Sequence, residues 1–280
     1  MSKRPIIALD AGHGLHTLGK RCLKAIDLAE TREWWLNDRI ADRVQELMAS
    51  YDCTVIRVDD TTGARDISLA SRVKTANSAA ADMYISIHHN AGIKGGTGGG
   101  TVVYYCSSAG VRPLQAQRLY NAVTARTGLF GNRSSKINYH GYYVIRKTTM
   151  PALLIENGFM DSKTDTPIIL SATHAERTAQ GIVDFLVAEL HLKAVQEGPQ
   201  QPQTGELIAA GNSQTASTYY PAYTGPKTTL SAAMMALGLD ASYTNRKLIA
   251  KANNITAYVG TAAQNTRMYN LLAAGLLERE

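Results

Sequence analysis

The chain has 280 residues, of which 45% are hydrophobic and 19% are charged. This composition supplies apolar side chains for one sizeable core with a smaller one beside it, and it excludes a mostly disordered chain. The net charge of +6 and the pI near 9.2 favour acidic partners such as nucleic acid, anionic lipid or anionic polymers, and the lack of a dense Lys/Arg run weighs against nucleic acid.

The three cysteines, Cys22, Cys53 and Cys106, are odd in number and lack Cys-x-x-Cys spacing. We therefore expect buried thiols and neither a disulfide framework nor a thiolate zinc site. The N-terminal apolar run Ile6–Leu9 is too short for a signal peptide or a membrane span. The sequence thus predicts synthesis in the cytoplasm and no membrane insertion, so action outside the cell would require a separate release step.

Apolar periodicity predicts strands that alternate with helices over the first 190 or so residues. In chain order, the expected elements are strand Ile6–Leu9, helix Glu30–Tyr51, strand Cys53–Val58, helix Leu69–Ala80, strand Met83–Ile87, strand Thr101–Cys106, helix Pro113–Thr127, strand Tyr142–Ile145, strand Ala152–Ile155 and helix His174–Leu190. This alternation predicts an α/β fold with a mostly parallel, twisted sheet flanked by helices.

The composition changes near residue 196, where the chain becomes rich in Gln, Pro, Gly, Ser and Thr until about residue 224. Such a segment is typical of a linker. Three short helices are expected beyond it, at Thr229–Leu237, Asn245–Asn253 and Thr261–Ala274. We therefore predict a large α/β domain over 1–192, a linker over 193–224 and a small all-α domain over 225–280.

Polar side chains that could carry chemistry follow three of the predicted strands. His13, His88 and Glu156 each lie just past a predicted strand, and in parallel sheets the carboxyl ends of the strands gather in one place. Two histidines and one carboxylate would supply the three ligands of a hydrolytic zinc site, with Glu30 and Glu33 as the candidate carboxylates. Glu156 could move protons, although a carboxylate that caps a turn would look the same from spacing alone.

Four stretches together resemble the zinc-dependent N-acetylmuramoyl-L-alanine amidases, the catalytic type of many phage endolysins and bacterial autolysins. Their order and spacing match that family over about residues 4 to 191, which makes the resemblance specific. The stretches are Leu9-Asp10-Ala11-Gly12-His13-Gly14, Glu33-Trp34-Trp35-Leu36-Asn37, Ser86-Ile87-His88-His89-Asn90-Ala91 and Leu154-Ile155-Glu156-Asn157-Gly158-Phe159.

The resemblance implies that His13, Glu33 and His88 bind Zn²⁺ and that Glu156 is the catalytic carboxylate. Glu33 is preferred to Glu30 because it stands four residues before an asparagine, as in the family's Glu-x-x-x-Asn pattern. The neighbouring His89 is expected to be a bystander. The bond cleaved would be the amide between N-acetylmuramic acid and the L-alanine of the stem peptide.

Two further residues carry weaker expectations. The segment after Gly14 departs from the commonest family form, so His16 could contact substrate, although a solvent-facing loop histidine is favoured. Arg146, in a stretch that resembles a family strand, could meet the acidic stem peptide.

The C-terminal stretches Tyr243–Ala250, Tyr258–Asn265 and Leu271–Leu277 resemble small helical modules at the ends of clostridial-type endolysins. This resemblance implies binding to peptidoglycan and its associated anionic wall polymers; a stabilising or self-associating appendage is the alternative. The whole chain is predicted to be an endolysin that acts at the bacterial cell wall after release from the host cytoplasm. A host autolysin or sporulation amidase, or a non-catalytic wall-binding protein, are the other interpretations.

Overall fold

The computed structural model describes residues 4–106, 113–195, 219–225 and 230–279, with short gaps at 242, 254, 256–257, 259 and 261. The chain divides into two compact units, Met1–Lys193 and Ala194–Glu280. Most of the predicted linker, residues 196–218, lies outside the described residues.

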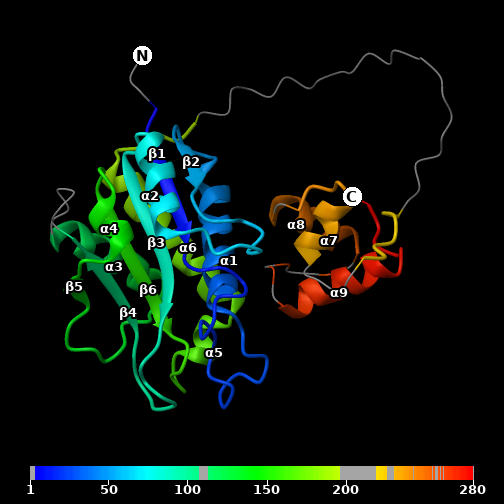
Figure 1. Ribbon diagram of the computed structural model, residues 1–280, viewed down its shortest axis with the longest axis horizontal. Helices are drawn as coiled ribbons and strands as arrows, with labels where there is room; N and C mark the ends of the chain where they lie inside the picture. The colour runs from blue at the N-terminus through cyan, green and yellow to red at the C-terminus, as the bar shows by residue number, and fades with distance from the viewer. Residues whose placement is uncertain are drawn as a thin grey trace. The chain divides into compact units, whose positions relative to one another are not determined.

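The first unit is built on one six-stranded sheet with the order β2-β1-β3-β6-β4-β5 (Figure 1). The strands β2, β1, β3 and β6 run parallel to one another, whereas β4 is antiparallel to β6 and parallel to β5. The mostly parallel sheet predicted from the sequence is therefore confirmed. The strands are β1 (Ile6–Ala11), β2 (Thr54–Arg57), β3 (Met83–Asn90), β4 (Thr101–Tyr105), β5 (Ile137–Tyr139) and β6 (Ala152–Phe159).

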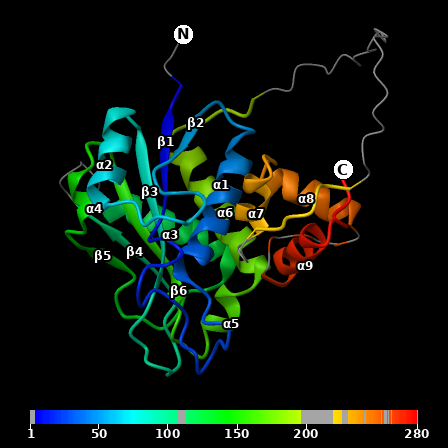
Figure 2. The same cartoon turned by 45° about the vertical axis from the view of Figure 1, so that its right-hand side comes forward.

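Helices cover both faces of this sheet, so the unit has three layers. The helices α1 (Glu33–Met48), α3 (Pro113–Thr127) and α6 (Ala172–Glu189) pack on one face, with α1 beside α6 (Figure 2). The other face carries α2 (Leu69–Ser78) and α4 (Tyr143–Lys147), and the short helix α5 (Thr166–Ile169) follows β6. Each layer contact encloses its own apolar core, and the three cysteines lie buried as expected.

Two of the helices begin at serines that supply a missing hydrogen-bond partner. The Ser68 side chain accepts from the backbone N–H of Ser71 at the start of α2, and Ser171 accepts from that of His174 at the start of α6. These bonds satisfy N–H groups that have no partner within the helix, and each cap stabilises the fold by about 1 kcal/mol.

The prediction for the segment before β6 was wrong. Residues 142–145 were predicted as a strand, but residues 143–145 form the first turn of the helix α4. In this turn Val144 and Ile145 pack into the apolar core on the α2 face of the sheet, and the Thr148 hydroxyl donates to the Val144 carbonyl at 2.9 Å. The edge position next to β4 is instead taken by β5, a three-residue strand with too little apolar pattern to be predicted.

The second unit contains α7 (Leu230–Ala236), α8 (Tyr243–Ala252) and α9 (Ala262–Ala273), at the positions where helices were predicted. Its core includes Met234, Ile249 and Leu272, and Tyr220 and Tyr223, from the described segment 219–225, pack against it. Tyr220 and Tyr223 donate their N–H groups to the carbonyls of Leu277 and Leu272, at 2.9 and 3.1 Å. None of the helices in the described part of the chain is long and apolar enough to cross a lipid bilayer.

Candidate metal centre

His13 lies just beyond β1, in a turn that requires glycine before it. Gly12 donates its N–H to the Ile87 carbonyl at 3.0 Å, which continues the pairing of β1 with β3. A Cβ atom added to Gly12 would lie 2.0 Å from Cε1 of His88, so only glycine leaves room for that ring. His13 adopts a left-handed conformation with φ +70°, and its ring lies edge-on to that of His88, 4.9 Å away between centroids.

Three successive carbonyl groups of this turn accept hydrogen bonds from side chains on two helices. Arg72 on α2 donates to the carbonyls of Ala11 and His13, both at 2.8 Å. Asn37 on α1 donates to the Gly12 carbonyl at 3.1 Å. Because α1 and α2 lie on opposite faces of the sheet, the turn is held from both sides, which stabilises the strained left-handed residue.

Asp10 holds the guanidinium of Arg72 beneath this turn. The two side chains form a buried ion pair, and the hydroxyls of Tyr84 and Ser86 donate to the second Asp10 oxygen at 2.8 and 2.7 Å. Burial alone would raise the pKa of Asp10, but the Arg72 charge and the hydrogen bond from Ser86 outweigh it and hold the pKa below its usual value. The carboxylate is therefore ionised at neutral pH, with partners that offset its desolvation.

The sequence analysis missed Arg72. The available signal was its position on α2, where Arg72, Val73 and Ala76 form the buried face of the helix. An arginine on an apolar helix face indicates a buried carboxylate partner, because an unpaired charge there would be strongly destabilising.

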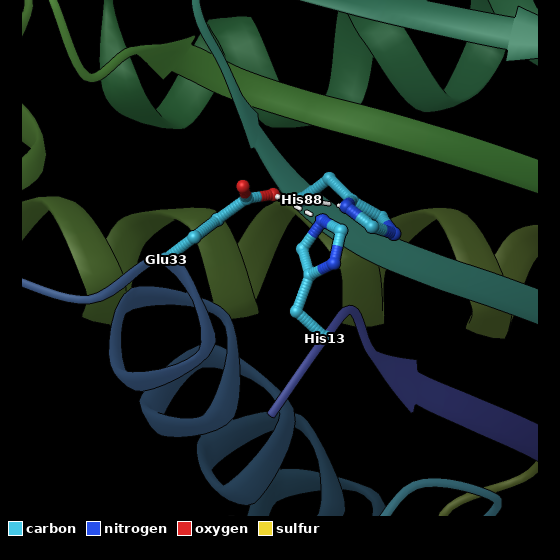
Figure 3. Close-up of side chains that lie close together, drawn as sticks. All are labelled: His13, Glu33 and His88. Atoms are coloured by element: carbon cyan, nitrogen blue, oxygen red, sulfur yellow. Dashed lines mark hydrogen bonds and ion pairs between the residues drawn. The ribbon is translucent and has the colours of Figure 1, made fainter. Parts of the chain in front are cut away.

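Glu33 is the first residue of α1, and its side chain is only 1% exposed. Its Oε1 lies 3.0 Å from Nδ1 of His88 and 3.3 Å from Nε2 of His13 (Figure 3). The backbone N–H of His89 donates to the same oxygen at 3.3 Å. Burial would raise the pKa of Glu33, but the interactions with the two imidazoles outweigh it and hold the pKa below its usual value.

Glu30, the other candidate carboxylate, points elsewhere. It forms ion pairs with Arg21 at 3.1 Å and Lys24 at 4.0 Å, in the loop before α1. The structure therefore brings Glu33, and not Glu30, together with His13 and His88, in the grouping that the sequence predicted.

The donor atoms of His13, Glu33 and His88 suit a divalent metal ion. They lie within 4.8 Å of one another, the one group of its kind among the His, Cys, Asp and Glu side chains of the described residues. Oε2 of Glu33, which is 3.8 Å from Nζ of Lys20, and Nε2 of His13 are buried without a well-aligned hydrogen bond, so both atoms are available to bind a further ligand. Two imidazoles and one carboxylate form a donor set typical of hydrolytic zinc sites.

His88 and His89 have opposite surroundings because successive side chains of a strand point to opposite faces. Burial would lower the pKa of His88, but the hydrogen bond and charge of Glu33 outweigh it and raise the pKa. On the other face, Nδ1 of His89 lies 2.8 Å from Oδ1 of Asn37, and burial lowers the pKa of His89 well below its usual value. The asparagine of the Glu-x-x-x-Asn pattern thus links His89 to the turn that carries His13.

His88 and Glu156 lie within strands, and not in the loops after them as predicted. They are register partners of the parallel pair β3 and β6, which continues beyond the apolar runs ending at Ile87 and Ile155. Backbone pairing with a neighbouring strand does not require an apolar side chain, so the apolar pattern ended these strands too early. The pairing brings Glu156 beside the cluster of His13, Glu33 and His88.

Glu156 combines a buried oxygen with a neutral-range pKa. Burial raises its pKa to about 7, with the His88 charge acting against the rise and the Glu33 charge adding to it. Its Oε2 is buried without a hydrogen-bond partner. A carboxyl group with these properties can both accept and donate a proton near neutral pH. His16, by contrast, is exposed in the loop after β1.

Comparison with known proteins places this site in a family. The family model described as N-acetylmuramoyl-L-alanine amidase matches residues 7–188, well over half of the chain. The chain belongs to the N-acetylmuramoyl-L-alanine amidases. It is therefore an enzyme that hydrolyses peptidoglycan, and the matched residues contain the whole cluster described above.

Individual relatives agree with this assignment. The endolysin of Bacillus phage SPP1 is 29% identical over 218 residues, which cover 76% of this chain and 75% of that protein. The N-acetylmuramoyl-L-alanine amidase CwlM of Bacillus licheniformis is 32% identical over 189 residues, covering 66% of this chain and 69% of that protein. Among solved structures, the catalytic domain of the amidase CwlV from Bacillus (Paenibacillus) polymyxa var. colistinus matches with a TM-score of 0.59 at 26% identity, covering 68% of this chain and 99% of that one.

Proposed function

We propose that this amidase binds Zn²⁺ through His13, Glu33 and His88 and that Glu156 transfers the protons of the reaction. The bond cleaved would be the amide between the lactyl group of N-acetylmuramic acid and L-alanine. The observation that carries the proposal is the convergence of two imidazoles and a buried carboxylate beside Glu156 at the ends of β1, β3 and β6.

In this scheme each residue has a separate task. A bound zinc ion would supply Lewis-acid chemistry by lowering the pKa of water and polarising the scissile carbonyl. Glu156 accepts a proton from the attacking water and delivers it to the departing L-alanine nitrogen as the C–N bond breaks. Arg72 and Asn37 keep the His13 turn in place through its three carbonyl groups.

Mapping of the cleaved bond tests the assignment. Purified protein with zinc should release free N-terminal alanine from solubilised wall, and it should create no new reducing sugar ends. Reducing ends, or neither product, would contradict the reaction. Chelation should abolish the release and added Zn²⁺ should restore it, whereas activity unaffected by chelation would contradict the metal.

The endolysin reading is favoured because the similarity to the SPP1 endolysin extends over 76% of this chain. The second candidate is a host amidase, supported by 33% identity over 128 residues to the sporulation-specific amidase of Bacillus subtilis. The two readings differ in substrate. An endolysin should lyse vegetative cells and cleave their wall faster than spore-cortex peptidoglycan, and the opposite preference would favour the sporulation role.

For the second unit we propose wall binding by residues 225–280, joined to the catalytic unit by residues 193–224. Its helices enclose their own apolar core, which supports an independently folded module. A linked binding module raises the effective concentration of the enzyme at an insoluble polymer. Anionic wall polymers and self-association are the finer alternatives for what this module contacts.

Truncation separates these roles. A chain ending at Lys193 should cleave soluble muropeptides at the full-length rate but sediment poorly with intact walls. Unchanged wall binding would contradict the targeting role. Sedimentation analysis of both chains tests self-association, which predicts an oligomer only for the full-length protein.

A further inference from the structure

A groove lies on the β4–β5 side of the site, and the chemistry proposed above does not use it. Its volume is about 670 Å³, and its walls include Asn90, Tyr104, Asn132, Arg133 and Tyr139. That size suits a short peptide or a sugar unit, because small-ligand sites span about 300–1,000 Å³.

The groove begins next to the catalytic carboxylate. Val102 lines it and is the register partner of Glu156 in the antiparallel pair β4 and β6. Asn90, two residues after His88 on β3, lines the same groove. Burial raises the pKa of the Tyr104 hydroxyl, the charge of Glu156 raises it further and that of Arg133 opposes the rise, so both charges act on this one side chain. A substrate bound over Glu156 can therefore extend directly into the groove.

The charge of the groove has one sign. Among the described residues that line the groove, none is Asp or Glu, whereas Arg133 supplies a positively charged guanidinium group. The guanidinium carbon lies 5.2 Å from the ring centroid of Phe159, which is buried at the end of β6. Stacking on an aromatic face orients a guanidinium and leaves its N–H edge free to donate.

Several arginines of this unit are paired with a carboxylate, and others, such as Arg32 and Arg39, donate to backbone carbonyls. Arg43, Arg57 and Arg126, for example, each form an ion pair with Asp or Glu. In the described part of the chain, no carboxylate lies within ion-pair distance of Arg133. An oriented guanidinium without an anion, in a groove without acidic side chains, is suited to an anion supplied by the substrate.

We propose that this groove binds the stem peptide and that Arg133 binds the free α-carboxylate of its second residue, D-glutamate. The inference rests on the proposed function, because the scissile amide defines the two ends of the substrate. On the sugar side, the lactyl carboxyl group is consumed in that amide and leaves no charge. On the peptide side, the D-glutamate carboxylate is one residue beyond L-alanine, and some walls carry an uncharged carboxamide there.

Arg133, and not Arg146, is assigned this role. Arg146 was the sequence-based candidate for the acidic stem, but it lies on α4, does not line the groove and donates from Nε to the Gly141 carbonyl at 3.2 Å. The two arginines therefore provide rival variants for one experiment.

The experiment compares two synthetic muropeptides that differ only at D-glutamate, as the free acid or as D-isoglutamine. The full-length zinc-loaded enzyme should cleave the acid with a kcat/KM about 10 to 100 times higher, because hydrogen bonds between charged groups are the stronger ones. Arg133→Gln should remove this preference by raising KM for the acid with little change in kcat. Arg133→Lys should retain part of it.

Two controls make the outcomes distinct. Arg126→Gln, which alters an exposed arginine of α3, should leave the preference unchanged, and zinc content should be equal in all variants. Equal cleavage of both substrates by the wild type, or loss of the preference in Arg146→Gln instead of Arg133→Gln, would overturn the proposal. Failure of the wild type to cleave either substrate would instead overturn the proposed function.

Discussion

The site has two sides, a β1–β3 wall that carries the cluster of His13, Glu33 and His88 and a β4–β5 wall that carries the groove, and their charged side chains are held in different ways. On the β1–β3 wall, Asp10, Arg72 and Glu33 are buried and surrounded by partners within the protein. On the β4–β5 wall, Arg133 is exposed and stacks on a ring without a carboxylate partner. The difference suits the proposed tasks: metal ligands and proton carriers need one fixed geometry, whereas a group that recognises substrate needs hydrogen-bonding capacity left free.

The largest effect should come from the adjacent histidines of β3. His88→Ala should abolish retained zinc and activity, because it removes a proposed ligand. His89→Ala should retain zinc but lower the free energy of unfolding by about 1–3 kcal/mol, because Oδ1 of Asn37 loses a buried partner. Metal analysis after dialysis, together with urea unfolding, measures both. Equal zinc loss in the two variants would erase the proposed distinction.

Glu156→Gln should keep the metal and lower kcat about 10²- to 10⁴-fold, the usual contribution of a positioned acid–base group. The amide is close in size but cannot accept the proton. Glu176→Gln, which removes the carboxylate paired with Arg43 on the outer helices, is the matched control and should stay active. An active Glu156→Gln enzyme would remove the proposed role of this carboxylate.

Arg72→Met should destabilise the protein by about 3–5 kcal/mol, because it leaves the Asp10 carboxylate buried without its counter-charge. Arg126→Met breaks a solvent-exposed ion pair with Asp184 and should change stability little. Urea unfolding of both variants checks the comparison. Similar small losses would mean that the β1–β3 wall does not depend on its buried ion pair.

The smallest effect concerns the back of β6, where Nε2 of His174 lies 3.2 Å from the Asn157 carbonyl. Burial, aided by the Arg39 charge, lowers the pKa of His174 to about 4. Protonation of His174 therefore favours the unfolded chain. The stability that the neutral imidazole contributes is complete above the unfolded pKa of about 6.5 and is lost as the pH falls toward 4. The loss should reach at most about 3 kcal/mol.

The variant His174→Gln separates the contribution of His174 to the free energy of unfolding from the titration of the carboxylates. The stability difference between wild type and variant should shrink between pH 7 and pH 4.5 in urea unfolding. A difference that stays constant over this range would show that His174 does not titrate as described.

Much of the site could be predicted from the sequence. Short motifs placed His13, His88 and Glu156 near strand ends, and the Glu-x-x-x-Asn spacing selected Glu33. The structure brings Glu33 to the two histidines, whereas Glu30 pairs with Arg21. The positions near strand ends follow from local pattern, because apolar runs form the strands and the polar residues stand where those runs end. The choice of Glu33 over Glu30 came from the resemblance to the family's motif.

Only the tertiary structure decided which polar residues support the site and which are left free. Arg72 lies 62 positions after Asp10 in the chain, and Arg133 is 26 residues before the ring on which it stacks. Residues 143–145 are helical because Val144 and Ile145 pack into the apolar core on the α2 face of the sheet, while β5 is the strand that pairs with β4. Local sequence encodes the faces of strands and helices. The pairing of buried charges depends on which of those faces meet, and that is determined when the whole core packs.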